Sequence, residues 1–130
     1  MQTILVVDDE ELVLSLVCTV LENAGYDVLR AASGAQALAL ALCQGHQGPI
    51  HLALLDVMMP GMSGPELREC LREMLPSVRI LYMSGYTHSQ IGEHGIKADP
   101  ADFIGKPFSP ATLLRHIQEE LSEPRRRHGH

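Results

Sequence analysis

The chain has 130 residues and a formal net charge of −6 at pH 7, with 45% hydrophobic and 20% charged residues. This length suits one domain that buries its core without disulfides. The acidic charge, the 4% aromatic content and the absence of Trp argue against direct nucleic-acid binding. Every apolar stretch is too short for a membrane span, so we expect no membrane insertion. We expect no signal peptide either, because the first strand begins at Thr3.

The cysteines and the end of the chain add two expectations. Cys18, Cys43 and Cys70 are widely spaced, and no CxxC pattern occurs. This spacing predicts reduced thiols in a cytoplasmic protein, with neither a disulfide framework nor a zinc site. Residues 122–130 are polar and basic, so we expect a flexible tail or linker after a domain that spans residues 1–121.

Apolar strands alternate with helices along the whole chain. The alternation predicts an α/β fold, a doubly wound parallel sheet of five strands with five helices on its two faces. Local signals support the helix boundaries, because Gly25 can cap a helix C-terminus, Ser33 an N-terminus, and Pro65 suits a first turn. The predicted strands are 3–7, 26–31, 50–55, 78–83 and 102–104, and the predicted helices are 10–23, 35–44, 65–74, 89–94 and 110–121.

The first predicted helix shows the clearest apolar periodicity. Its apolar residues recur at helical spacing, which is typical of an amphipathic helix packed on a sheet. The residues that carry this pattern are Leu12, Val13, Leu16, Val17, Val20 and Leu21.

Charged residues stand where three of the predicted strands end. Asp8 and Asp9 follow ILVV, Asp56 follows HLALL, and Lys106 follows DFIG. Each carboxylate alone could simply cap the next helix. If the strands are neighbours, however, the carboxylates converge at one edge of the sheet, where ligands bind in such folds. Their mutual repulsion then calls for a lysine or a hard divalent cation, and Mg²⁺ prefers such oxygen ligands.

A hydroxyl group and a glycine extend this predicted pocket. Ser84 ends the fourth strand, and Gly85 offers an unshielded backbone N–H. The set fits phosphoryl transfer to a carboxylate, which depends on positioning and charge neutralisation. The peptide bond between Lys106 and Pro107 is a candidate for the cis form, since prolyl bonds lower its cost.

In combination, these motifs resemble the receiver domain of two-component response regulators. The stretches are ILVVDDE (4–10), LLDVMMPGMSGPEL (54–67), MSGY (83–86) and FIGKPFSPATLL (103–114), and the resemblance extends from Thr3 to about Leu121. It implies the flavodoxin-like receiver fold with strand order 2-1-3-4-5. The MSGYT and KPFSPATLL stretches are more similar to receivers attached to hybrid sensor kinases than to those fused to DNA-binding domains. We expect a cytoplasmic location, either as a stand-alone protein or as the cytoplasmic part of a membrane-bound hybrid kinase.

The resemblance also implies a role for each site residue. Asp56 would be the phosphoacceptor. Asp9, Asp56 and the backbone carbonyl of Met58 would bind Mg²⁺, or alternatively Mn²⁺, and Asp8 would act mainly through water. Lys106 would contact the phosphoryl group.

A second implied group forms the switch. Ser84 and the backbone of Gly85 would bind the phosphoryl oxygens, and Phe103 would turn inward when the hydroxyl of Ser84 moves toward the phosphate. The implied donor is a sensor histidine kinase or a histidine phosphotransfer protein. The face formed by the fourth helix and the fifth strand would bind an output protein or a second copy.

Two other functions are possible alternatives to a phosphorylation switch, one an enzyme and one a binding module. A Mg²⁺-dependent aspartyl-phosphate phosphohydrolase would use similar chemistry, but it needs a cap domain and a second acidic residue where Met58 stands. A phosphorylation-independent interaction module would retain the acidic pocket without using it. Turnover of varied phosphate esters would favour the phosphohydrolase, and an Asp56 that stays unmodified by a phosphodonor would favour the interaction module.

Overall fold

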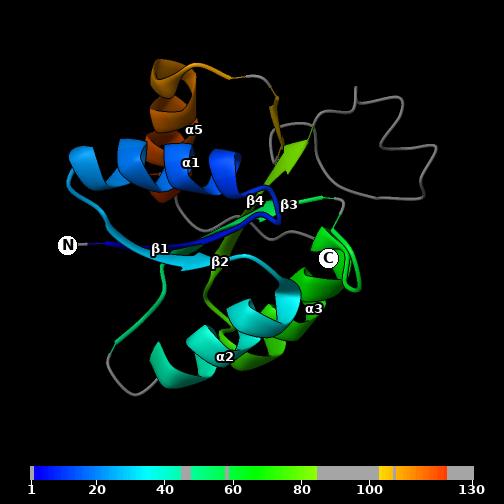
Figure 1. Ribbon diagram of the computed structural model, residues 1–130. Coiled ribbons are helices and arrows are strands. Elements are labelled where there is room, and N and C mark those ends of the chain that lie inside the picture. Colours follow the sequence, from blue (N-terminus) through cyan, green and yellow to red (C-terminus); the bar gives the residue numbers. More distant parts are fainter. Residues whose placement is uncertain (1, 45–47, 58, 85–102, 107, 123–130) are drawn as a thin grey trace.

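The computed structural model describes residues 2–44, 48–57, 59–84, 103–106 and 108–122. Strands and helices alternate from β1 to β4, as predicted, and β5 and α5 follow after residues 85–102, which are not described (Figure 1). The elements are β1 (Thr3–Val7), α1 (Glu11–Asn23), β2 (Asp27–Ala31), α2 (Gly34–Gln44), β3 (Leu52–Asp56), α3 (Gly64–Met74), β4 (Arg79–Ser84), β5 (Phe103–Gly105) and α5 (Pro110–Ser122). The predicted helix at 89–94 lies outside the described residues.

The strands form one parallel sheet in the order β2-β1-β3-β4-β5, which confirms the implied topology. β1 and β3 lie inside the sheet, and every residue of both strands is buried. Continuous apolar runs suit such strands because helices cover both faces of a parallel sheet.

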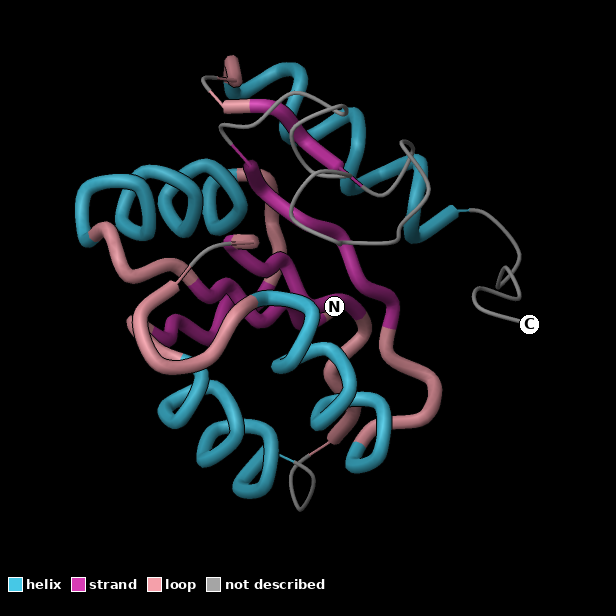
Figure 2. The backbone as a smooth tube through the Cα atoms, turned by 90° about the vertical axis from the view of Figure 1, so that its right-hand side faces the viewer, coloured by secondary structure: helices cyan, strands magenta, loops and turns pink. Residues whose placement is uncertain are grey.

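Two apolar cores lie on opposite faces of the sheet. α1 and α5 cover one face and α2 and α3 cover the other, a layering that is also visible from the side (Figures 1 and 2). The helices place their buried residues against alternate residues of the strands, since successive strand side chains point to opposite faces. The sheet edge where the strands end is therefore held from both sides.

The packing of α1 differs from the simple amphipathic prediction. The helix buries Leu14, Val17, Cys18 and Leu21, whereas Leu12 is 88% exposed and Leu16 is 53% exposed. Helical spacing identifies apolar stripes but does not choose which one meets the sheet. α1 carries two, and only one is covered by the described residues.

The helix boundaries follow the expected local signals. Gly25 has a φ of 99°, which suits its place just after α1. Ser33 Oγ accepts a hydrogen bond from the Gln36 N–H at 3.1 Å. At α3, Pro65 stands in the first turn, and Ser63 and Glu66 form a reciprocal capping box that was not predicted.

The cysteines occur as free thiols, with Cys18 buried, Cys43 exposed and Cys70 partly buried. Within the described part of the chain, no helix combines the length and apolar character needed to cross a membrane.

Candidate functional site

The pairing of β1 with β3 brings the predicted carboxylates together. Val7 pairs with Leu55, so Asp8 and Asp56 stand next to each other where the two strands end. Asp8 is completely buried and Asp56 is 6% exposed. The N–H of Glu10 donates to Asp8 Oδ1 at 2.9 Å, which orients that carboxylate at the start of α1. Two acidic groups are thus buried side by side.

Asp9 completes an acidic cluster at this edge. Asp8, Asp9 and Asp56 each offer a carboxylate oxygen, and these oxygens lie within 4.8 Å of one another. Asp9 is exposed, whereas the other two are buried, so the cluster opens to solvent on one side. Three convergent oxygen donors of negative charge fit a hard divalent cation such as Mg²⁺.

Lys106 supplies the positive charge of the site. Its ammonium donates to Asp8 Oδ2 at 3.0 Å and lies 3.5 Å from Asp56 Oδ1. A third carboxylate, that of Glu10, lies 3.9 Å away and was not predicted. Burial alone would lower the pKa of Lys106, but its hydrogen bond to Asp8 and the surrounding carboxylate charges raise the pKa above its ordinary value.

Asp56 has the most perturbed acidity in the site. Its burial and the neighbouring charge of Asp8 raise the pKa of the carboxyl to about 7, although Lys106 acts in the opposite direction. A hydrogen bond and the charge of Asp9 raise this pKa further. Without a cation in the acidic cluster, the carboxyl of Asp56 is therefore partly protonated near neutral pH.

The start of α3 supports the backbone of Asp56. The N–H of Gly64 donates to the Val57 carbonyl at 2.9 Å. A Cβ on Gly64 would lie only 2.5 Å from the Asp56 carbonyl oxygen, so only glycine allows this approach. The capping box of Ser63 and Glu66 then fixes the first turn of α3. Gly64, within the LLDVMMPGMSGPEL stretch, thus has a packing role that was not predicted from the sequence.

The predicted switch residues lie along β4 and β5. Ser84 is buried at the end of β4, and its carbonyl accepts a hydrogen bond of 2.7 Å from the Lys106 N–H. The ring of Phe103 stacks on that of Tyr82, with centroids 5.2 Å apart. Ser84 and Lys106 are therefore coupled through the backbone of the β4–β5 pair. The predictions for Met58, Gly85 and Pro107 fall outside the described residues.

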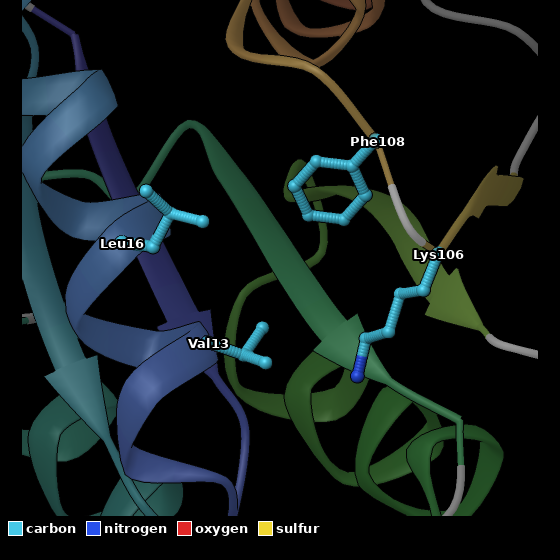
Figure 3. Close-up of a pocket in the computed structure, with 4 residues that line it drawn as sticks. All are labelled: Val13, Leu16, Lys106 and Phe108. Carbon is cyan, nitrogen blue, oxygen red and sulfur yellow. The ribbon is translucent and has the colours of Figure 1, made fainter.

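An apolar cavity of about 300 Å³ lies next to this site. Val13 and Leu16 extend into it from α1, Phe108 faces them from the segment before α5, and Lys106 forms part of the wall (Figure 3). The exposed stripe of α1 continues the apolar surface, since Leu12 and Leu16 are both exposed. The ammonium of Lys106 thus lies at the acidic cluster, while the same side chain forms part of the wall of the apolar cavity.

Comparisons with known proteins agree with this geometry. Residues 4–118 match the family model of the response regulator receiver domain. Among curated proteins, the chain is 34% identical to the sensor kinase CckA of Brucella abortus, over 93% of the chain and 13% of the relative. It is also 34% identical to the phosphate regulon transcriptional regulatory protein PhoB of Pseudomonas aeruginosa, over 92% of the chain and 52% of the relative. The chain therefore spans about half or less of these relatives.

Solved structures give the same result. The chemotaxis protein CheY4 of Vibrio cholerae superposes with a TM-score of 0.75 at 32% identity, over 92% of this chain and 98% of that one. The receiver domain of the hybrid histidine kinase CckA has a TM-score of 0.74 at 34% identity, over 92% and 99%. With its sheet order, its acidic cluster and a family match over residues 4–118, the chain belongs to the response regulator receiver domains of two-component systems.

Proposed function

We propose that the chain is a phosphorylation-controlled switch in which Asp56 accepts a phosphoryl group from a phosphohistidine of a partner protein. The observation that carries this proposal is the convergence on Asp56 of a partly buried ammonium, 3.5 Å away, and two further carboxylates. Such a site favours a reaction in which charge on a transferred group must be neutralised.

In the proposed transfer, a carboxylate oxygen of Asp56 attacks the phosphorus. A P–O bond forms, the P–N bond breaks, and the imidazole nitrogen of the donor keeps the electron pair and takes up a proton. Asp56 must be ionised to attack, so neutralisation of the neighbouring negative charge by a cation favours the reactive form. Asp8, Asp9 and Asp56, with the carbonyl of Met58, would hold Mg²⁺ or Mn²⁺, and the bound ion would neutralise charge on the phosphoryl oxygens.

The switch would begin at Lys106 and Ser84. A phosphoryl group adds about −1.5 to −2 charge at pH 7, which attracts the ammonium of Lys106 and the hydroxyl of Ser84. Because the Lys106 N–H is bonded to the Ser84 carbonyl, a movement of either residue involves both β4 and β5. Phe103 is the first residue of β5, and its ring stacks on Tyr82 of β4. The movement of β4 and β5 would therefore alter the surface around these two rings, where an output partner would bind.

The donor would dock on the exposed stripe of α1. This apolar surface and the cavity lined by Val13, Leu16 and Phe108 share Lys106 with the acidic site. An apolar side chain placed there brings the rest of a donor close to Asp56. A sensor histidine kinase or a histidine phosphotransfer protein fits this role, in a cytoplasmic setting and with the receiver spanning residues 1–121.

Beryllofluoride and a small phosphodonor test the proposal. With Mg²⁺ present, acetyl phosphate should add one alkali-labile phosphoryl group to the wild-type protein, and Asp56→Asn should remain unmodified. Beryllofluoride should change the fluorescence or NMR spectrum of the wild type alone. Unchanged mass and spectra under saturating donor would reject the switch, whereas continuous turnover of varied phosphate esters would favour a phosphohydrolase.

A further inference from the structure

Met62 occupies a tightly packed and partly exposed position close to the phosphoacceptor. It lies in the segment between β3 and α3, after Gly61, whose φ is 83°. Its side chain packs against the core that α2 and α3 form on their face of the sheet. A Cβ added to Gly34 would lie only 2.8 Å from Met62 Sδ, so the thioether fits against the first residue of α2 with no spare room on that side.

The two residues that follow Met62 link it to the backbone of Asp56. The next residue, Ser63, caps α3, and the one after it, Gly64, donates to the Val57 carbonyl at 2.9 Å. Gly64 also lies against the Asp56 carbonyl closely enough to exclude a Cβ. A displacement of Met62 from Gly34 would therefore move a segment whose other end fixes the backbone of the phosphoacceptor.

We propose that Met62 is a site of reversible oxidation by peroxides, and that its sulfoxide lowers phosphoryl acceptance at Asp56. The proposal rests on the proposed function of Asp56. A lone pair of the thioether attacks one peroxide oxygen, the S–O bond forms and the O–O bond breaks, and the second oxygen leaves as water after proton transfer. The sulfur is oxidised and the peroxide is reduced. A methionine sulfoxide reductase restores the thioether.

The sulfoxide does not fit the observed packing. Oxidation converts a flexible apolar side chain into a polar one with an additional oxygen. The side of Met62 that faces Gly34 has no room for this oxygen, and the core on which Met62 packs is apolar. The sulfoxide would therefore turn toward water, which would separate Met62 from α2 and loosen the start of α3.

Other methionines provide internal controls. Met83 is completely buried in β4 and is protected from solvent. Met74 is 37% exposed but stands in the last turn of α3, about 15 Å along the helix from its start. Oxidation of Met74 should therefore proceed without affecting Asp56.

The experiment compares wild type, Met62→Leu and Met74→Leu before and after hydrogen peroxide, followed by dithiothreitol to reverse sulfenic acids and disulfides at the three cysteines. Leucine replaces methionine with little change in volume. Oxidised sites are mapped by peptide mass spectrometry. Beryllofluoride affinity with Mg²⁺ and hydrogen exchange of the peptide that contains residues 59–67 are then measured.

We expect oxidation to weaken beryllofluoride binding by about tenfold in wild type and Met74→Leu, with faster exchange in residues 59–67. Methionine sulfoxide reductase should reverse both effects, and Met62→Leu should show neither. Equal loss in Met62→Leu, or full sulfoxide formation at Met62 without either effect, would overturn the proposal. If the unoxidised protein fails to bind beryllofluoride, the proposed function fails, and the exchange measurement still decides whether oxidation loosens this loop.

Discussion

The ammonium of Lys106 donates a hydrogen bond of 3.0 Å to Asp8, a residue 98 positions earlier in the chain. Asp8 is completely buried, and a buried carboxylate is costly without a cationic partner. The same ammonium lies 3.5 Å from Asp56. One lysine thus compensates two buried charges, which links the stability of the site to its proposed chemistry.

Replacement of Lys106 should destabilise the metal-free protein. Lys106→Met keeps an apolar side chain beside the cavity but leaves Asp8 buried without its cation, so we expect a loss of about 3 kcal/mol in the free energy of unfolding. Mg²⁺ should restore part of the loss. Urea denaturation with and without Mg²⁺ measures both effects. Arg115→Met, which breaks the exposed pair with Glu119, is the control and should cost less than about 1 kcal/mol.

The stability of the metal-free protein should depend on the ionisation of Asp56. The pKa of its carboxyl is about 7 in the folded chain against an ordinary value of 3.8, so the folded state binds more protons between these values. The free energy of unfolding should therefore fall as pH rises from about 4 to about 7, by at most about 1.4 kcal/mol per pH unit from this group. Denaturation in EDTA of wild type and Asp56→Asn tests this slope.

Asp56→Asn removes the titrating group and is the matched comparison. The free energy of unfolding of Asp56→Asn minus that of wild type should increase from about pH 4 to about pH 7 and level off above that. A constant difference between the two proteins from pH 4 to pH 8 would contradict the raised pKa of Asp56.

Gly64→Ala should distort the support of the Asp56 backbone. The new Cβ would come within 2.5 Å of the Asp56 carbonyl oxygen, so the start of α3 must shift. We expect a loss of about 1–3 kcal/mol in stability, together with weaker beryllofluoride binding. Gly105→Ala is the control, because its Cβ meets nothing within 4 Å. Equal effects of the two substitutions would argue against close packing as the cause.

The ion pair between Arg79 and Glu120 should stabilise the attachment of α5 to the sheet. Arg79 Nη1 lies 3.4 Å from Glu120 Oε2, and it also donates to the Glu120 carbonyl; the side chains are 18% and 5% exposed. A double-mutant cycle with Arg79→Met and Glu120→Gln should give a coupling of about 1–3 kcal/mol in thermal or urea denaturation.

The exposed pair of Arg30 and Glu22, 3.7 Å apart, provides a second cycle for comparison. Its coupling should stay below about 1 kcal/mol. If both cycles give the same small coupling energy, burial does not strengthen the interaction between Arg79 and Glu120.

The exposed stripe of α1 should affect protein donors but not small ones. Leu16→Asp places a charge beside the apolar cavity, so we expect phosphoryl transfer from a histidine kinase active on the wild type to slow by about tenfold or more. Acetyl phosphate should modify both proteins at similar rates. Leu42→Asp, on the exposed part of α2, is the control and should behave as wild type with both donors. Slower reaction of Leu16→Asp with acetyl phosphate would indicate damage to the site itself.

Much of the fold could be predicted from the chain because its strands are apolar throughout and its helices carry local caps. Gly25, Ser33 and Pro65 each have the conformation or contact that their residue type favours. Periodicity was less informative in α1, where Leu12 and Leu16 fit the apolar pattern but remain exposed. Local spacing cannot distinguish two apolar stripes when only one can face the sheet.

The sequence by itself determined that four charged residues stand at strand ends, that the strands are parallel, and that the combined motifs resemble a receiver. Those features are local, or depend on residue types in a fixed order. The tertiary structure alone decided that Lys106 meets Asp8 at 3.0 Å, that Gly64 touches the backbone of Asp56, and that Met62 fits against Gly34. The contacts of Lys106 with Asp8 and of Met62 with Gly34 join segments far apart in sequence, and the approach of Gly64 to Asp56 depends on how the loop between β3 and α3 folds back. Their distances depend on how the strands pair and how α2 and α3 pack together.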